Sequence, residues 1–280
     1  MRDTRIESMS TTLGIKELFW FIGFTEAEGS FTVARRGDMQ FVITQGYRNV
    51  AVLHYIKSLL GFGVVTKQGA RTFRYVVQDK EGLRKIIELL HGNLVLEKRI
   101  EEMKRFVAAY AQKYDVKIEP KLTRYQPTRN DGWISGFTDG DGCFNIGWVE
   151  TTKTFLIRFI LSQKDDIEHI RQVIGGSMEK HKVNGGRSIV LKDLSGGEGK
   201  NTMWLLEYFA EYPLKTSKLN SYYIWEYLRG RLLKGPLKSE EIEGIKVTAR
   251  LINQIEPSLL DEVWIPQEDG EIVLSEKGEK

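Results

Sequence analysis

The sequence predicts an α+β fold of two pseudo-symmetric αββαββα modules, each a four-stranded antiparallel sheet with helices on one face. The first supporting observation is a twelve-residue motif that starts at Trp20 and recurs at Trp133, with Gly-Phe-Thr, two acids and a glycine at matching positions. The second is that the same succession of helical and alternating segments follows both copies. Because the second acids, Glu28 and Asp141, lie 113 positions apart, we interpret the chain as one duplicated module.

Each motif predicts a buried helix that carries its second acid at the carboxyl end. The apolar residues before the acids are numerous enough for two or three turns, and glycine commonly ends a helix in the left-handed conformation. We therefore expect the helices to end at Gly29 and Gly142 in that conformation. A stripe of small residues on each helix would let the two backbones nearly touch and bring the acids side by side. The stripe consists of Gly23 and Ala27 in the first copy and of Gly136 and Gly140 in the second.

The first module follows residues 1–14, which show no periodicity and are expected to form a flexible arm. Alternation of apolar and polar residues predicts hairpins, and apolar residues spaced by three or four predict helices. In order, the expected elements of this module, 15–114, are a hairpin at 30–36 and 39–45, a helix at 50–60, a hairpin at 64–68 and 72–78, and helices at 83–90 and 97–110.

Residues 115–130 contain two prolines and several basic residues, which predicts a linker. The second module, 131–255, repeats the order of the first and adds one helix. Its expected elements are a hairpin at 143–149 and 154–163, a helix at 165–174, a hairpin at 177–183 and 187–194, helices at 203–212 and 217–233, and the added helix at 239–255. The remaining residues, 256–280, form an acidic tail without a counterpart in the first half.

Composition limits the classes of function. With 280 residues and 41% hydrophobic content, the chain can bury one large core or two modest ones. Nothing resembles a membrane span or a secretory signal, and the single cysteine excludes an internal disulfide and a cysteine-based zinc site. The net charge of +3 combines −6 on the tail with +9 on residues 1–255. A basic body is compatible with a nucleic-acid partner, and we expect an intracellular protein without a membrane partner.

Two carboxylates at neighbouring helix ends form an electrostatically poor arrangement. The carboxyl end of a helix already carries about half a negative charge, and Glu28 and Asp141 would repel each other. A hard cation such as Mg²⁺, which prefers oxygen ligands and retains water, would relieve this repulsion. One alternative is a solvated helix end with incidental acids, and another is the carboxylate pair of a glycosidase. A calcium loop does not fit, because Cys143 follows Gly142 and the spacing of further acids fails.

At these motifs the chain resembles the LAGLIDADG homing endonucleases, specifically their single-chain, two-repeat members. Phe21 to Gly29 and Ile134 to Gly142 fill the nine positions of that motif, with Glu28 and Asp141 at its second acidic position. The resemblance covers about residues 17–235. It implies a monomer that hydrolyses both strands of a long, asymmetric double-stranded DNA target and leaves staggered ends. It also implies dependence on Mg²⁺, with Ca²⁺ or Mn²⁺ able to substitute for binding or activity.

The resemblance extends to polar residues around the acids. Phe41-Val-Ile-Thr-Gln45 matches Phe159-Ile-Leu-Ser-Gln163, and Leu94-Val-Leu-Glu-Lys98 matches Leu214-Lys-Thr-Ser-Lys218. In the family, the polar residue that closes the second strand and the lysine at the start of a later helix lie near the metal ions. Catalytic roles are therefore implied for Gln45, Gln163, Lys98 and Lys218, beside the metal ligands Glu28 and Asp141. Any of the four polar residues, taken alone, is more often an ordinary surface residue.

The sheet face away from the helices is expected to bind DNA. A two-stranded ribbon fits the major groove, where Arg, Gln and Asn can bind base edges, and two such faces would follow DNA for roughly two helical turns. The alternative is an ordinary solvated face. The expected DNA-binding residues are Ser30, Thr32, Arg36, Gln40, Val42, Thr44, Lys67, Thr72, Arg74, Val76, Gln78, Cys143, Asn145, Arg158, Ser162, His181, Ser188 and Lys192.

Two other activities of the same fold stay open beside the nuclease. The family includes relatives that assist the splicing of intron RNA and relatives that bind DNA without cutting it. A protein that only binds would be expected to lose one acid of the pair, and both acids are present here. The prediction is therefore a nuclease encoded in an intron, with intron RNA left open as a further partner. The resemblance also implies an organellar location, in a mitochondrion or chloroplast.

Overall fold

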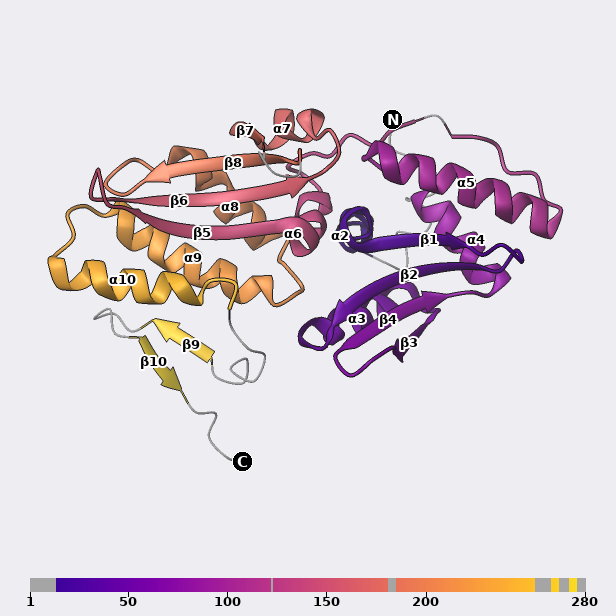
Figure 1. The fold of residues 1–280 in the computed structure, drawn as a ribbon, viewed down its shortest axis with the longest axis horizontal. Helices are drawn as coiled ribbons and strands as arrows, with labels where there is room; N and C mark the ends of the chain where they lie inside the picture. Colours follow the sequence, from indigo (N-terminus) through magenta and orange to yellow (C-terminus); the bar gives the residue numbers. More distant parts are fainter. Residues whose placement is uncertain (1–13, 122, 181–184, 255–262, 267–271, 276–280) are drawn as a thin grey trace.

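The computed structural model describes residues 14–121, 123–180, 185–254, 263–266 and 272–275. These residues form two modules side by side, with one helix of each module between the two sheets (Figure 1). None of the described helices is long and apolar enough to cross a membrane. The expected arm, apart from Gly14, and most of the acidic tail lie outside the described residues.

The N-terminal module consists of one sheet and the helices that pack on it. The strand order is β1-β2-β4-β3, and every pair in this sheet is antiparallel. Its elements are α2 (Ile15–Glu28), β1 (Gly29–Val33), β2 (Met39–Gly46), the 3-10 turn η1 (Tyr47–Asn49), α3 (Val50–Leu60), β3 (Val64–Lys67), β4 (Thr72–Val77), α4 (Lys80–Leu90) and α5 (Glu97–Tyr114). Each element expected from the sequence is present, with ends shifted by a few residues.

The C-terminal module repeats this topology with the strand order β5-β6-β8-β7. Its elements are α6 (Trp133–Asp141), β5 (Gly142–Val149), β6 (Thr154–Gln163), α7 (Glu168–Ile174), β7 (Ser177–Lys180), β8 (Arg187–Leu194), α8 (Lys200–Glu211), α9 (Lys218–Leu233) and α10 (Ser239–Leu251). A separate pair of short strands, β9 (Val263–Pro266) and β10 (Ile272–Ser275), follows. The predicted α+β fold with two four-stranded antiparallel sheets is confirmed.

Alternation along the strands decides which face meets the helices. Phe41 and Ile43 of β2 and Tyr75 and Val77 of β4 are fully buried. The C-terminal sheet buries its inward residues in an aromatic cluster around Phe144. Burial of one such side chain contributes roughly 1.5–3 kcal/mol, so these inward rows fix the register. The intervening rows face away from the helices and form an open face on each sheet.

The helices α2 and α6 touch where they carry glycine. A Cβ atom on Gly23 would lie 2.0 Å from the carbonyl oxygen of Trp133, and one on Gly136 would lie 1.9 Å from that of Trp20. Real Cβ atoms essentially never come this close. The expected stripe of small residues is therefore confirmed as the contact between the two helices.

The glycines after the two acids adopt extended backbone, and the expectation of a left-handed helix end was wrong. Gly29 has φ −71° and ψ 152°, and Gly142 has φ −78° and ψ 153°. Each helix passes directly into a strand, so no left-handed residue is needed. Glycine is required here by space, because a Cβ would lie 2.6 Å from Cγ2 of Thr25 or 2.5 Å from Cγ2 of Thr138.

The segment between the modules is tied to both of them: the backbone N–H of Tyr125 donates to the carbonyl of Leu94 (3.2 Å), and Arg129 contacts the C-terminal module. The described residues of 115–130 contain no helix or strand. Arg129 stacks 4.1 Å from the ring centroid of Trp204 and donates to the carbonyls of Val173 and Ile174 at the end of α7.

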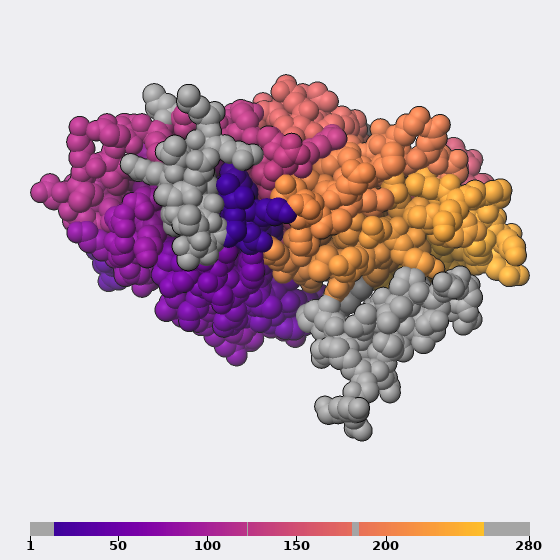
Figure 2. All heavy atoms as spheres, turned by 180° about the vertical axis from the view of Figure 1, so that it is seen from behind, coloured from indigo at the N-terminus to yellow at the C-terminus, as the bar shows by residue number. Residues whose placement is uncertain are grey.

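The reverse side shows the two modules packed against each other along a continuous seam (Figure 2).

Candidate functional site at the crossing helix ends

The second acids of the repeated motif lie at the ends of the crossing helices. Glu28 is the last residue of α2 and Asp141 the last residue of α6, and both are half-buried. Burial, followed by the nearby Asp141 carboxylate, raises the pKa of Glu28. Burial also raises the pKa of Asp141. Because the pair is poorly solvated, a positive charge at this place would stabilise its ionised form.

A glutamine from each sheet lies against each acid. Gln163, at the end of β6, donates through Nε2 to Oδ2 of Asp141. Gln45, near the end of β2, makes a polar contact with the Glu28 side chain. Each contact lowers the pKa of its acid and so opposes the effect of burial. The fold thus brings both acids and both glutamines together.

Lys218, the first residue of α9, reaches the carboxyl end of α6. Its Nζ donates to the carbonyl oxygens of Thr138 (3.0 Å) and Gly140. Burial lowers the pKa of Lys218, and the surrounding carboxylates oppose that shift. In return, the lysine charge lowers the pKa of Asp141 and of Glu28. This cation therefore compensates both the helix end and the acid pair.

Lys98, the expected partner of Lys218 in the N-terminal module, is exposed, and Arg99 occupies the comparable place. Arg99 donates from Nε to the carbonyl of Glu26 (2.8 Å) and from Nη2 to the carbonyl of Ala27 (3.1 Å). These carbonyls belong to the last turn of α2, and the arginine charge lowers the pKa of both second acids. The two matched lysines therefore differ in their surroundings, and the role implied for Lys98 stays a prediction.

The two later helices begin at similar places relative to the first motif acids. The buried acid Glu26 accepts from the backbone N–H of Leu96 (3.2 Å), and Asp139 accepts from that of Thr216 (3.0 Å). Lys98 and Lys218 each stand two residues after the anchored residue, and Ser217 already has helical φ −57° and ψ −12° before α9.

The first motif acids, Glu26 and Asp139, anchor the helix ends. Burial raises the pKa of Glu26 to about 8 and also raises that of Asp139. Asp139 has side-chain partners as well, since Trp20 Nε1 (2.8 Å) and Thr216 Oγ1 (2.5 Å) donate to it. Their only signal in the sequence was recurrence two positions before the second acids.

Few protein groups at the helix ends could bind a metal ion. No group of three or more His, Cys, Asp or Glu side chains that could hold a metal ion occurs in the part of the chain that the structure describes. The carbonyls of Ala27 and Gly140 already accept from Arg99 and Lys218. A hard cation that keeps water and shares ligands with a bound phosphate fits two carboxylates of this kind. The acid pair therefore suits Mg²⁺ when oxygen ligands from outside the chain complete the shell.

The open face of the N-terminal sheet carries most residues expected to contact DNA. The register places Ser30, Thr32, Gln40, Val42, Thr44, Thr72, Arg74 and Val76 on this face, together with Val64 and Thr66, which were not expected there. Gln78 follows β4 and donates to Gln40 Oε1 at 3.1 Å. Val42 and Val76 are only 5% and 9% exposed, so they contribute little surface.

Two expected DNA-binding residues of this module lie elsewhere. Lys67 pairs with Phe73, which packs against the core, so the expected place of Lys67 on the open face was wrong. Arg36 lies beyond the end of β1 and pairs with Asp38. The strand stops early because turn hydrogen bonds begin at Ala34.

The open face of the C-terminal sheet holds Cys143, Asn145, Arg158, Ser162, Ser188 and Lys192, as expected. Several of these side chains are already paired. Arg158 donates twice to Oδ1 of Asn145, at 3.1 and 2.6 Å, and the hydroxyls of Ser162 and Ser188 lie 2.7 Å apart. His181 lies outside the described residues.

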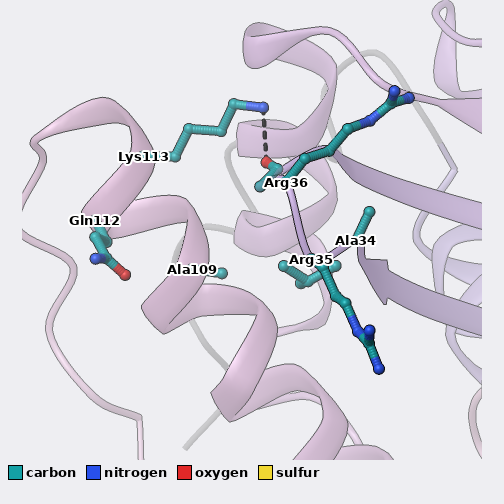
Figure 3. Close-up of a pocket in the computed structure, with 8 residues that line it drawn as sticks. Ala34, Arg35, Arg36, Ala109, Gln112 and Lys113 are labelled. Atoms are coloured by element: carbon teal, nitrogen blue, oxygen red, sulfur yellow. Dashed lines mark hydrogen bonds between the residues drawn. The ribbon is translucent and has the colours of Figure 1, made fainter.

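A pocket of about 510 Å³ lies between the β1–β2 turn and the second half of α5 (Figure 3). Its lining includes Arg35, Arg36 and Lys113, and Lys113 donates to the carbonyl of Gly37 at 2.9 Å. The pocket lies at the opposite end of β1 from the acid pair. Its cations extend the basic surface of the module to the tip of its first hairpin.

Known proteins share this sequence pattern. A family model described as LAGLIDADG endonuclease matches residues 21–110 and 134–228. The probable intron-encoded endonuclease 4 of Neurospora crassa is 35% identical over 216 residues, which cover 74% of this chain and 38% of that protein. The intron-encoded RNA maturase bI4 of Saccharomyces cerevisiae is 26% identical over 170 residues, which cover 60% of this chain and 26% of that protein. The chain thus spans well under half the length of these two relatives.

A solved structure shares the fold. I-SmaMI, bound to an uncleaved DNA target in the presence of calcium ions, superposes with a TM-score of 0.62 and 18% identity. The match covers 85% of this chain and 99% of that chain. At this identity the likeness concerns the fold, and it includes both modules.

Proposed function

Because the chain belongs to the LAGLIDADG endonuclease family, we propose that it is a homing endonuclease that hydrolyses both strands of a long, asymmetric double-stranded DNA target. The observation that best supports this proposal is the acid pair, Glu28 and Asp141, at the ends of the crossing helices between the two sheets. A protein that only bound DNA would gain nothing from two half-buried carboxylates that repel phosphate.

The two acids would hold Mg²⁺, which when bound supplies an activated water and stabilises the leaving oxygen of an in-line displacement. The chain's own residues prepare this place. Gln45 and Gln163 lie against the acids and keep the carboxylates oriented. Lys218 and Arg99 bring positive charge to the helix ends, where it would offset negative charge that develops on the phosphate. One acid in each module suits one cut in each strand, which would leave staggered ends.

The open faces are proposed to read the target in the major groove. Arg158 is held by Asn145 and so presents a guanidinium suited to the O6 and N7 atoms of guanine. Because the side chains of the two faces differ, the target should be asymmetric. One chain supplies both faces, so a monomer would suffice.

The module boundaries are part of the same proposal. Residues 15–114 and 131–255 would form the two DNA-binding modules, with 115–130 as the linker and 256–280 as an appended tail. The names of both curated relatives describe them as intron-encoded, which supports an intron location for this gene. An organellar location stays a prediction.

Cleavage of a randomised double-stranded DNA library tests the proposal. With Mg²⁺ we expect one long site to be cut in both strands with a stagger, and sequencing of the ends would identify it. With Ca²⁺ in place of Mg²⁺, the protein should still bind its site in the library but should cut it far less. Blunt cutting, or cutting without sequence preference, would contradict the proposed function.

RNA splicing is a second candidate, supported by the likeness to the yeast maturase. A maturase would bind structured intron RNA tightly and accelerate its splicing. Tight binding of such RNA by a protein that cuts no DNA in the library would favour this candidate over the nuclease.

A further inference from the structure

Asn49 connects the two modules beside the acid pair. It is the last residue of η1 and directly precedes α3. Its Oδ1 accepts from the backbone N–H of Ser217 at 3.0 Å, and its Nδ2 donates to Oε1 of Gln45 at 3.3 Å. Gln45 in turn lies against Glu28 and lowers the pKa of its carboxyl. One side chain therefore links the N-terminal glutamine to the start of α9, whose first residue is Lys218.

These hydrogen bonds have a fixed direction. The backbone N–H of Ser217 can only donate, so Asn49 turns its oxygen toward it and its amino group toward Gln45. Gln45 then presents its oxygen to Asn49 and its amino group to Glu28, and an ionised carboxylate can only accept. The orientation of both amides thus follows from one backbone donor in the opposite module.

The C-terminal module has a different residue at the matching position. Four residues after Gln45 stands Asn49, and four residues after Gln163 stands Ile167. The Ile167 side chain is fully buried in the core and has no hydrogen-bonding group. Position 167 therefore cannot orient Gln163 as Asn49 orients Gln45.

We propose that Asn49 is a positioning residue: it holds the amide of Gln45 with its amino group toward Glu28 and thereby acts on one of the two strand cuts. The inference rests on the proposed nuclease function. The affected cut is the one that Gln45→Ala slows more, whereas Gln163→Ala should slow the other. Substitution of Asn49 should therefore slow the same cut that Gln45→Ala slows.

Cleavage of a duplex target labelled separately on each strand tests the proposal. Asn49→Ala removes both hydrogen bonds and should slow the Gln45-dependent cut about tenfold, leaving the other cut within about twofold. Asn49→Asp keeps an acceptor for Ser217 but offers Gln45 only acceptors, so Gln45 would turn its oxygen toward Glu28. This variant should slow the same cut more than Asn49→Ala does. In a Gln45→Ala background, neither substitution should cause a further loss.

Asn130→Asp is the matched control, because it makes the same exchange at an exposed linker residue near the amino end of α6, away from Asp141. It should change neither cut. Equal slowing of both cuts by Asn49→Ala, or a loss that adds fully to that of Gln45→Ala, would overturn the proposal and leave Asn49 as a packing contact between the modules.

A second measurement needs no cleavage. In ¹⁵N-labelled protein, the side-chain amide signals of Gln45 can be identified by their loss in Gln45→Ala. They should shift in Asn49→Asp while those of Gln163 stay in place. Unchanged Gln45 signals would overturn the assignment of Asn49, whether or not the protein cuts DNA. Shifted signals in a protein that cuts no DNA would contradict the nuclease function and its strand effect, but not the contact itself.

Discussion

The two modules share the order of their strands and of their paired helices, yet they differ where their acids meet. Gln45, which Asn49 holds, and Arg99 lie near the N-terminal acid, Glu28, and lower its pKa. The C-terminal acid is served by Gln163 and Lys218. The backbone repeats because buried rows and touching helices tolerate little change. The polar residues differ because an acid needs a donor and a cation, and several side chains can supply them. A symmetric fold can therefore hold two acids with unequal surroundings.

Removal of one acid at a time is the strongest test of this comparison. Glu28→Gln and Asp141→Asn keep the shape of each side chain but remove its charge. We expect each to lower double-strand cleavage at least about 10³-fold, a loss of about 4 kcal/mol of transition-state stabilisation. Binding, measured by gel shift, should persist because a charge that repels phosphate is lost. A variant that no longer binds the target would contradict a role in metal binding.

Removal of one basic residue at a time tests which cation supports cleavage beside each acid. Lys218→Met and Arg99→Met should each slow cleavage about 10²-fold, since each removes a charge beside the acids. Lys98→Met should cost no more than about twofold, because an exposed charge contributes little. Strand-resolved rates measure all three. If Lys98→Met slows cleavage as much as Lys218→Met and Arg99→Met does not, then Lys98 is the counterpart of Lys218, as the sequence predicts. Arg99 would then not be its counterpart.

Filling the helix contact tests whether the modules contribute equally to it. Gly23→Ala and Gly136→Ala each place a methyl group against the backbone of the other helix. Overpacking of this kind should lower the free energy of unfolding by about 1–3 kcal/mol, and by similar amounts for both. Gly244→Ala is the control: it lies in α10 with open space around it, and should raise stability by about 0.5–1 kcal/mol. Urea unfolding measures these changes, and a neutral Gly23→Ala would mean that the helices can separate at no cost.

The last expected difference concerns the pH dependence of stability that the two buried first acids cause. The pKa of Glu26 rises from 4.5 to about 8 in the folded protein. Between these values the folded state keeps a proton that the unfolded chain has lost, so stability should fall as pH rises through this window and level off above it. Glu26→Gln should remove this slope, which is at most about 1.4 kcal/mol per pH unit.

Urea unfolding at several pH values measures that slope. Asp139→Asn should change it less, because Trp20 and Thr216 donate side-chain hydrogen bonds to the Asp139 carboxylate. Equal changes in the two variants would show that these extra donors do not distinguish the modules.

The sequence predicted the elements better than it predicted their neighbours. The helix expected at 50–60 was correct to the residue, because Gly61, with φ +76°, ends it by a local rule. The pairing of the two acids was predicted because a repeated motif and a helix end can both be recognised in the sequence. Arg99 was missed because its match in the second module is Leu219, which carries no charge. Asn49 was missed because its partner, Ser217, lies 168 positions away.

The reciprocal contact of Gly23 with the Trp133 carbonyl and of Gly136 with the Trp20 carbonyl has the form of an isologous interface, in which each side offers the same patch. Such a patch does not distinguish an unlike half from a second copy of its own half. The linker resolves this ambiguity, because it keeps the unlike partner at a high effective concentration. Covalent connection therefore adds to unsymmetrical hydrogen bonds between the modules, such as Asn49 with Ser217 and Trp20 with Asp139, and both favour the pairing of two different halves.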